Sequence, residues 1–290
     1  MIVDVQRGAE LLRAGELVAF PTETVYGLGA NALDPAAVEK IFVAKGRPPE
    51  SPLIVHAASI EGAQALVTGW PESAEKLARR HWPGPLTLVL PKREQIPARV
   101  TAGLPTVGIR VPAHPIAIEL IRLVGLPVAA PSANRFAGLS PTTAEHVSRS
   151  LPDIPVVDGG ATPVGIESTV LSLAGPSPVL LRPGMISREE IESLIGPVAI
   201  GGSVDGPHAS PGLHRRHYSP RTPLYLGTPP STGRGVIANL PDEPFACAAA
   251  LYATLHKLDL EGWDWIAVRM PPGTPEWAGI RDRLQRAAAS

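Results

Sequence analysis

The stretch FPTETVYGLGANA, residues 20–32, decides how the N-terminal half of the chain is interpreted. It follows an apolar run that ends at Phe20, and Gly27 and Gly29 begin the string G-x-G-x-x-A, which is typical of dinucleotide-binding loops. In those loops the glycines open a helix directly. Here the helix signal is Asp34-Pro35, an N-cap followed by proline, which comes five residues after Gly29. We therefore expect a tight glycine turn that lets the chain pass close to a ligand, and not a dinucleotide loop.

Composition limits the class of protein. The chain has 290 residues, 44% of them hydrophobic, so it can bury a core and form one large domain or two. A net charge of -1 disfavours a protein whose main task is to coat nucleic acid. No apolar run approaches the roughly 18 residues of a membrane span, and the first residues lack the features of a signal peptide. We expect a cytoplasmic protein with no membrane attachment.

Metal-binding patterns are weak in this sequence. The only cysteine, Cys247, excludes an internal disulfide framework and a zinc site built on paired cysteines. It lies in an apolar stretch with helical spacing, which predicts a buried structural thiol. His214 and His217 have the spacing H-x-x-H, but they fall in a segment with no helical pattern, so the spacing carries little weight.

Strand-like and helix-like segments alternate as far as about residue 200, which predicts an α/β fold with a mixed sheet. Two matches to the capping box S/T-x-x-E, at Thr142 and Ser187, predict helix starts. The segment from Gly196 to Pro220 is rich in glycine, proline and serine and lacks periodicity, as is typical of a linker. We predict three parts: residues 1–200, a linker or lid at 201–220, and a C-terminal domain at 221–290.

The C-terminal domain is expected to be a second, smaller α/β unit. Its predicted elements are strands at 223–226, 235–238 and 265–270 and helices at about 244–261 and 276–289. About 70 residues are few for a domain that folds alone, because a small domain buries a smaller share of its surface.

Polar residues gather at the ends of several predicted elements. Lys45 and Arg47 follow the first long helix; the pair could converge on one phosphate, or it could simply be a favourable cation pair at a helix C-terminus. Ser132 and Asn134 follow a buried strand, where they could hold nucleotide oxygens or only form a turn. Arg182 ends an apolar strand, which is unusual for a charge that has no partner or ligand.

Eight motifs occur in order and together carry a family resemblance. They are FPTETVYGLG, AKGRP, PLIVH, WPGPLTLVL, TVGIRVP, APSAN, ESTV and LLRPG. The chain resembles the Sua5/YrdC family of L-threonylcarbamoyladenylate (threonylcarbamoyl-AMP) synthases, densely over residues of about 10–195. SPGLHRRHYSP at 210–220 resembles the linker of the two-domain Sua5 branch, and the tail resembles a shortened Sua5 C-terminal domain. The resemblance implies a YrdC-like twisted open mixed sheet with flanking helices, plus a small Rossmann-like α/β domain.

The resemblance also implies a reaction. Family members are nucleotidyltransferases that make threonylcarbamoyl-AMP and diphosphate from L-threonine, bicarbonate and ATP, with Mg²⁺ accompanying the ATP. N-carboxythreonine attacks the α-phosphorus of ATP. The product serves the t6A modification at position 37 of ANN-decoding tRNAs, where downstream threonylcarbamoyl transferase proteins act. No serine, histidine and aspartate triad is needed, because the nucleophile is the substrate carbamate.

Site residues follow from the matching motifs. The resemblance places threonine on five residues: Thr24, His56, Arg110, the backbone of Ala130, and Ser168. It places ATP on eight residues: Arg47, Ser51, Thr106, Ser132, Asn134, Ser140, Arg182 and Tyr218. Lys45 and Arg47 are the expected catalytic cations, since phosphoryl transfer depends on positioning and charge stabilisation. Glu23 and Glu167 lie in the right motifs for Mg²⁺, but the sequence assigns neither.

Three other functions remain open at this point. The first is a double-stranded RNA or tRNA-binding module of YrdC type without synthase activity, against which the near-neutral charge and 4% aromatic content count. The second is a relative that acts in another carbamoylation, such as hydrogenase maturation. The third is a nucleotide-regulated interaction protein, which would bind ATP without needing threonine.

Overall fold

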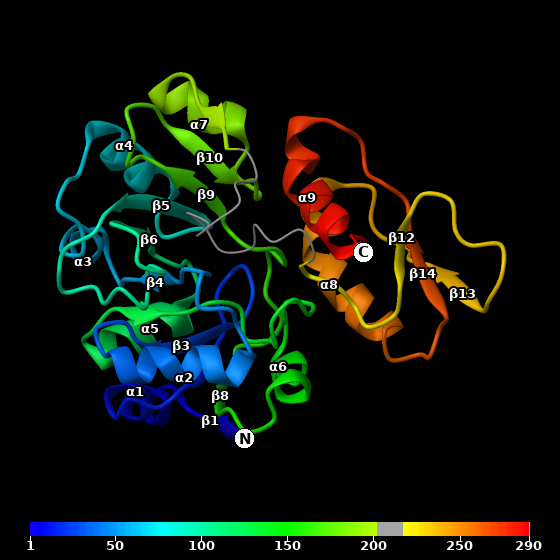
Figure 1. Cartoon of the computed structure of the whole chain (residues 1–290), viewed down its shortest axis with the longest axis horizontal. Coiled ribbons are helices and arrows are strands. Elements are labelled where there is room, and N and C mark those ends of the chain that lie inside the picture. Colours follow the sequence, from blue (N-terminus) through cyan, green and yellow to red (C-terminus); the bar gives the residue numbers. More distant parts are fainter. Residues whose placement is uncertain (202–216, 290) are drawn as a thin grey trace.

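The computed structural model describes residues 1–201 and 217–289, and within them the chain forms two α/β units (Figure 1). The first unit is built on an eleven-stranded mixed sheet in the described residues. Its strands, in sheet order, are β1 (Ile2–Val3), β8 (Val156–Val157), β2 (Val18–Phe20), β3 (Gly27–Asn31), β7 (Val128–Ala129), β4 (Ile54–His56), β6 (Thr106–Arg110), β5 (Leu86–Pro91), β9 (Thr169–Ser172), β10 (Val179–Arg182) and β11 (Ala199–Ile200). The predicted mixed sheet is confirmed.

The opening stretch does not form the glycine turn that the sequence predicted. Gly27 and Gly29 lie in β3, which pairs antiparallel with β2 so that Val18 faces Gly29 and Phe20 faces Gly27. A Cβ on Gly29 would stand 2.8 Å from Cε1 of Phe20, so the bare backbone makes room for the aromatic ring beside it. The prediction was wrong because this glycine meets a packing requirement across the sheet, which a local pattern does not show.

Helices cover the sheet of the first unit and begin where short polar side chains can cap them. They are α1 (Val5–Arg13), α2 (Pro35–Lys45), α3 (Ile60–Gln64), α4 (Glu72–His81), α5 (Pro115–Val124), α6 (Ala144–Ser150) and α7 (Arg188–Ile195). Asp34 accepts a hydrogen bond from the Ala36 N–H, and Gly46 ends α2 with a left-handed φ of 60°, both as predicted. Ser187 caps α7 as predicted, but α6 is capped by Thr143 and not by Thr142.

The second unit has a three-stranded parallel sheet in the order β12 (Leu224–Leu226), β14 (Trp265–Val268), β13 (Gly235–Ile237). Helix α8 (Pro244–Leu258), the 3₁₀ turn η1 (Pro275–Trp277) and helix α9 (Ala278–Ala287) complete it. The small α/β unit is therefore confirmed, although α8 ends three residues before the predicted 261.

The glycine- and proline-rich segment that starts at Gly196 begins with ordered sheet, just before the linker predicted at 201–220. Strand β11 pairs in parallel with β10, so the sheet of the first unit continues to Ile200. Residues 202–216, which include His214, lie outside the described residues. Within the described residues no helix is both long enough and apolar enough to cross a membrane.

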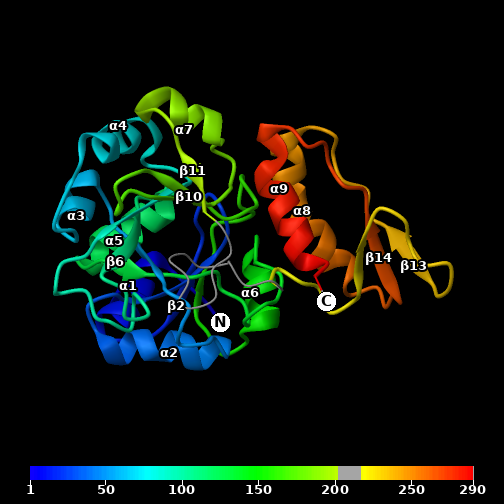
Figure 2. The same ribbon diagram turned by 45° about the horizontal axis from the view of Figure 1, so that its top comes forward.

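Helices α8 and α9 lie between the two sheets and face the first unit, as Figures 1 and 2 show. Val25, Leu139 and Ile166 of the first unit share one buried hydrophobic cluster with the apolar faces of α8 and α9. The contact is close, since a Cβ on Gly165 would stand 2.2 Å from the Ala248 carbonyl oxygen. The small unit thus gains buried apolar surface from its neighbour, which offsets the limited core that its own size allows.

Candidate active site

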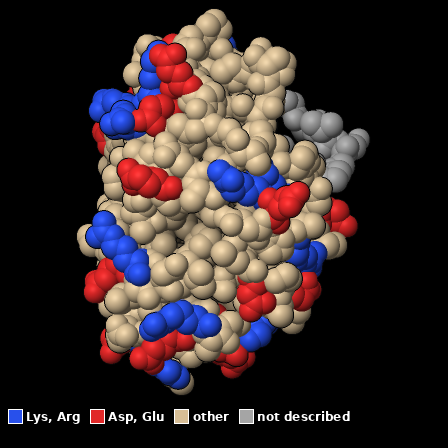
Figure 3. Space-filling model, turned by 90° about the vertical axis from the view of Figure 1, so that its left-hand side faces the viewer, with Lys and Arg blue, Asp and Glu red and all other residues tan. Residues whose placement is uncertain are grey.

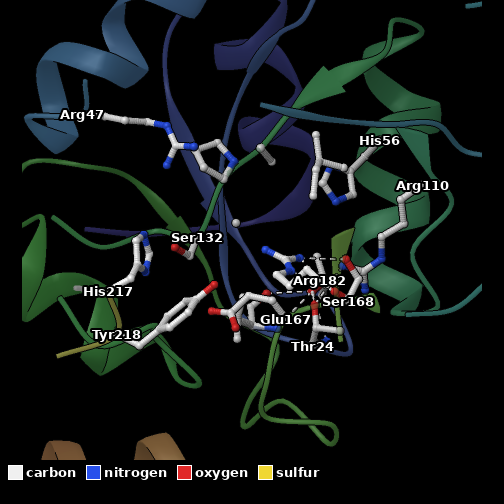
Figure 4. A pocket seen from close by; sticks show the side chains of 16 residues that line it. Thr24, Arg47, His56, Arg110, Ser132, Glu167, Ser168, Arg182, His217 and Tyr218 are labelled. Atoms are coloured by element: carbon white, nitrogen blue, oxygen red, sulfur yellow. Dashed lines mark hydrogen bonds between the residues drawn. The ribbon is translucent and has the colours of Figure 1, made fainter. Parts of the chain in front are cut away.

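A cavity of about 50 Å³ opens where the ends of several strands meet the start of the C-terminal unit (Figure 4). Its walls come from segments far apart in the sequence. The lining residues are Thr22, Thr24, Val25, Gly27, Arg47, Ile54, His56, Arg110, Ala130, Pro131, Ser132, Glu167, Ser168, Arg182, His217 and Tyr218. Strand order explains the convergence, because β3, β7, β4 and β6 are neighbours in the sheet.

Most residues that the sequence proposed for the site line this one cavity. The nine are Thr24, Arg47, His56, Arg110, Ala130, Ser132, Ser168, Arg182 and Tyr218. Five proposed residues lie outside the lining: Lys45, Ser51, Thr106, Asn134 and Ser140. Thr106 instead borders a separate, smaller cavity beside Val107 and Val89. The ligand contacts proposed for all of these residues stay predictions.

Arg110 and Thr24 form a tightly connected pair on one side of the cavity. The Nη1 of Arg110 donates to Thr24 Oγ1 at 3.0 Å, and its Nε donates to the Gly84 carbonyl at 3.1 Å. Its Nη2 lies 2.6 Å from Oε1 of Glu23, and both side chains of this ion pair are buried. Glu23 therefore holds the guanidinium in place, a role that the sequence did not assign.

Thr22 supports Thr24 from the same loop. Its hydroxyl donates to the Val25 carbonyl at 2.7 Å and lies 2.8 Å from the Thr24 hydroxyl. It also accepts hydrogen bonds from the N–H groups of Thr24 and Val25. The hydroxyls of this stretch were expected on the amino-acid side of the pocket, with Thr24 as the proposed ligand, and Thr22 lines the cavity beside it.

The imidazole of His56 adds an uncharged polar group to the cavity wall. His56 ends β4 directly beside Arg110 in β6. Burial and then the Arg110 charge lower the pKa of His56 to about 3, so the imidazole is uncharged at neutral pH. Ala130, which follows β7, donates its N–H to the Ile54 carbonyl of the adjacent β4, so only the Ala130 carbonyl could serve the ligand contact that we predicted.

Arg47 and Lys45 lie on the other side, and each is fixed by backbone carbonyls. Arg47 donates to the carbonyls of Ser51 and Pro52 at 3.3 and 2.9 Å, and burial lowers its pKa to about 10. The buried Lys45 ammonium donates to the carbonyls of Ser132 and Asn134. Burial, and then the Arg47 charge, lower the pKa of Lys45 well below its usual value. Lys45 thus shapes the loop that carries Ser132, and it does so from behind the cavity wall.

Ser168 and Arg182 stand together at the third wall. Arg182 donates to the Ser168 carbonyl through Nε and Nη2 at 3.1 and 3.0 Å, and to the Ser168 hydroxyl at 3.1 Å. The Ser168 hydroxyl also lies 2.8 Å from that of Thr87. The charge that seemed out of place at the end of an apolar strand therefore lines the cavity, with a carbonyl and a hydroxyl to orient it.

Glu167 connects the cavity to the second unit, and this part of the site was not predicted. Its Oε2 accepts from Arg283 Nε at 2.7 Å and from the Tyr252 hydroxyl at 3.1 Å, while Oε1 accepts from the Ser140 hydroxyl. Burial alone would raise the pKa of Glu167, but the charges of Arg283 and Arg182 and these hydrogen bonds outweigh it and lower the pKa. No motif singles out Arg283 or Tyr252, since each lies in an ordinary helical pattern.

Two residues near the end of the predicted linker complete the wall. The side chains of His217 and Tyr218 both face the cavity, with ring centroids 4.1 Å apart (Figure 4). Tyr218 is 1% exposed and is held in an uncommon left-handed conformation with φ 62°. His217 was considered only as part of the weak H-x-x-H pattern, and its place in the wall was missed.

Of the two carboxylates near the cavity, only Glu23 keeps an oxygen that could hold magnesium. Magnesium needs carboxylate oxygens that are free to coordinate. Both oxygens of Glu167 accept hydrogen bonds, whereas only Oε1 of Glu23 faces Arg110 and its buried Oε2 has no hydrogen-bond partner in the part of the chain that the structure describes. Among residues 1–201 and 217–289, no group of three or more His, Cys, Asp or Glu residues is arranged to hold a metal.

Comparison with known proteins identifies the family. A family model for the Sua5, YciO and YrdC domain, described as "Telomere recombination", matches residues 10–184. The chain belongs to the Sua5/YrdC family. A second model, described as the C-terminal domain of threonylcarbamoyl-AMP synthase, matches residues 186–289 of this Sua5/YrdC chain. The resemblance proposed from the motifs is confirmed, including its two-domain form.

Relatives of this Sua5/YrdC protein carry a common name. A protein from Bacillus subtilis named threonylcarbamoyl-AMP synthase is 44% identical over 320 residues, covering 98% of this chain and 92% of the relative. One of the same name from Pyrococcus abyssi is 54% identical over 223 residues, covering 74% of this chain and 65% of the relative.

Solved structures agree with the fold. A crystal structure of Pyrococcus abyssi Sua5 complexed with L-threonine matches with a TM-score of 0.93 and 40% identity, covering 99% of this chain and 97% of that one. A nucleotide-bound HypF structure matches with a TM-score of 0.56 at 22% identity, over 64% of this chain and 30% of that one, which shows a shared fold only.

Proposed function

We propose that this enzyme is a threonylcarbamoyl-AMP synthase, which joins L-threonine, bicarbonate and ATP into L-threonylcarbamoyladenylate and diphosphate. The observation that carries the proposal is the sorting of side chains around one cavity. Arg110, Thr24 and His56 lie on the side opposite Arg47 and Ser132 (Figure 4). This arrangement suits an amino acid beside a nucleotide. The names of the relatives and the threonine in the Pyrococcus abyssi structure support it.

The threonine side follows from hydrogen-bonding geometry. Arg110 offers a planar guanidinium that suits a carboxylate, and its orientation is fixed by Glu23, Thr24 and Gly84. The neutral His56 adds a polar group with no charge that would compete for that carboxylate.

The nucleotide side would stabilise charge on phosphate. The carbamate oxygen of N-carboxythreonine attacks the α-phosphorus, and the bond to the diphosphate leaving group breaks. Arg47 and Arg182 stay protonated at neutral pH and are pre-oriented by backbone carbonyls, so they could meet the developing charge without reorganising. This makes the enzyme a nucleotidyltransferase, whose catalysis rests on positioning and electrostatics.

We propose that Mg²⁺ enters with ATP and is held by phosphate oxygens and water. Magnesium commonly keeps several waters and binds through substrate phosphates. This assignment agrees with the carboxylate of Glu167, both oxygens of which already accept hydrogen bonds. We also propose that the product is used in the cytoplasm for t6A modification of tRNA by separate transferase proteins.

The alternative of a YrdC-type RNA-binding module is not favoured. The relatives bear the name of a synthase. Figure 3 shows Lys and Arg side chains interspersed with Asp and Glu on the face in view, with no continuous basic surface there. RNA recognition by shape would need such a surface for its contacts with phosphate.

Substitutions at Lys45 and Arg47 test the cation roles. We expect Lys45→Ala and Arg47→Ala to lower the rate of threonine-dependent diphosphate release by about 100-fold or more, as typical for groups that stabilise charge in the transition state or position one that does. Lys40→Ala is the matched control, because Lys40 lies in the same helix and bonds only Gly15 and Glu16 on the surface. Folding is checked by circular dichroism, and wild-type rates in both variants would sink the assignment.

A further inference from the structure

The C-terminal unit reaches the active site through one buried guanidinium, that of Arg283 in α9. Its side chain is fully buried. Its Nε donates to Glu167 Oε2 at 2.7 Å, and its Nη2 donates to the Glu167 carbonyl at 3.1 Å. Its Nη1 donates to the Pro183 carbonyl at 2.9 Å. Glu167 directly precedes Ser168, and Pro183 directly follows Arg182; both Ser168 and Arg182 line the cavity. Arg283 therefore hydrogen-bonds the chain immediately beside two lining residues, at the start of β9 and the end of β10.

The same guanidinium also contacts Tyr218, on another wall of the cavity. The Cζ of Arg283 lies 5.2 Å from the ring centroid of Tyr218, within the range of a cation–π contact. Helix α9 holds the neighbours of Tyr218 as well, since the Arg286 carbonyl accepts from the His217 N–H at 3.2 Å and the Ala287 carbonyl accepts from the Ser219 hydroxyl at 3.1 Å. Helix α9 therefore contacts two parts of the cavity wall that lie far apart in the sequence: the part around Ser168 and Arg182, and the part around His217 and Tyr218.

Burial of the Arg283 guanidinium between the two units is energetically costly unless its charge and its donors are paired. Burying a guanidinium requires partners for its donors and a counter-charge, and Arg283 has Glu167 and Asp282 within 2.8 Å. Its planar fork engages a carboxylate and two backbone carbonyls at once, which a lysine ammonium on a flexible stem could not reproduce. A buried apolar side chain would be enough if the interface served only to hold two units together.

We infer that Arg283 is a positioning residue for the active site, through which the C-terminal unit sets the placement of Ser168, Arg182 and Tyr218. The inference rests on the proposed function, because it concerns the same cavity. It gives the C-terminal unit a part in substrate binding that goes beyond anchoring the linker. Arg283 touches no reacting atom in this assignment and acts through Glu167 and Tyr218.

The test compares three full-length variants in the threonine-dependent diphosphate assay, well below their melting temperatures. Arg283→Met removes the guanidinium and Arg283→Lys keeps only its charge. Arg281→Met is the matched control, because Arg281 lies in the same helix and donates to the Pro271 carbonyl within its own unit. We expect kcat/KM for ATP to fall by about 100-fold in Arg283→Met and by about 10-fold in Arg283→Lys. In Arg281→Met it should stay within about twofold of wild type.

A merely structural role would give a different pattern. It would lower the amount of folded enzyme, and hence apparent kcat, while the KM for ATP stayed unchanged. Positioning predicts that KM for ATP rises in both Arg283 variants at full folded content. If Arg283→Met does not fold, the KM for ATP of Arg283→Lys is compared with that of wild type instead. An unchanged KM in Arg283→Lys would overturn the inference.

Hydrogen exchange provides a readout that does not need catalysis. In Arg283→Lys we expect amides of residues 165–168 to exchange at least about tenfold faster than in wild type, with residues 86–90 of β5 unchanged. Equal protection in both proteins would contradict the positioning role. If wild-type protein released no diphosphate but the exchange result held, the proposed function would fail and the positioning role would stand.

Discussion

Replacing Glu167 by glutamine should destabilise the protein by removing one charge from the buried pair between its two units. Glu167 and Arg283 are 9% and 0% exposed and lie 2.7 Å apart, so solvent screens the pair very little. Breaking a buried ion pair typically costs about 3–5 kcal/mol, because one charge is left without its partner. Asp282 remains 2.8 Å from Arg283, and glutamine keeps the shape and one acceptor, so we expect the lower end, about 3 kcal/mol.

Calorimetry gives this prediction a clear readout. For a chain of 290 residues about 3 kcal/mol corresponds to a fall in Tm of about 5 °C. The double variant Glu167→Met with Arg283→Met removes both charges and should recover most of that loss, since an apolar pair of similar volume often replaces a buried ion pair without cost. A Tm within about 2 °C of wild type for Glu167→Gln would refute the reasoning.

The same pair predicts a pH dependence. The pKa of Glu167 is lowered in the folded protein, so the pair contributes its full stability above the ordinary carboxyl pKa of 4.5. That contribution is lost as the pH falls through the lowered pKa, when the folded carboxylate finally takes up a proton. The difference in Tm between wild type and Glu167→Gln should therefore be constant above about pH 5 and shrink below the ordinary pKa.

Two further predictions concern packing and titration. Gly29→Ala should cost about 1–3 kcal/mol of stability, because its Cβ would stand 2.8 Å from Phe20 Cε1, whereas Gly69→Ala, with no heavy atom within 4 Å, should cost nothing measurable in urea denaturation. Equal midpoints for the two variants would contradict this packing argument. The pKa of His146 is lowered to about 3 by burial and by His256, so the unfolded chain protonates first and stability falls as pH drops from about 6.5 toward 3. His146→Gln should reduce that fall by about 1.4 kcal/mol per pH unit between pH 6 and 5, and an unreduced fall would show that His146 is charged in the folded protein.

Local chemistry predicted most of the fold correctly. Asp34 and Gly46 cap the two ends of α2, as the sequence predicts, because capping depends only on neighbouring backbone groups. The cap of α6 was misplaced by one residue, since Thr142 and Thr143 both carry a suitable hydroxyl and the tertiary position of the loop selects between them. Gly29 was assigned to a turn because its reason for being glycine is the Phe20 ring on the neighbouring strand.

The candidate site likewise contains residues that could be predicted from sequence motifs and contacts that could not. Thr24, His56, Arg110 and Ser168 belong to recognisable motifs at the ends of strands, and the sheet brings them together. Arg283 contacts Glu167 across 116 positions of sequence, and that contact exists only after α9 docks on the first unit. No periodicity or motif in the tail distinguishes Arg283 from the half-buried Arg281 and Arg286 in the same helix, so only the structure shows its role.

Identification of the product tests the central claim most directly. The protein is incubated with ATP, Mg²⁺, L-threonine and ¹³C-labelled bicarbonate, and the mixture is analysed at once by mass spectrometry. We predict an adenylate that contains threonine and one labelled carbon, and that disappears when threonine is left out. Absence of this species while the protein binds ATP and threonine, or an adenylate without the labelled carbon, would contradict the account.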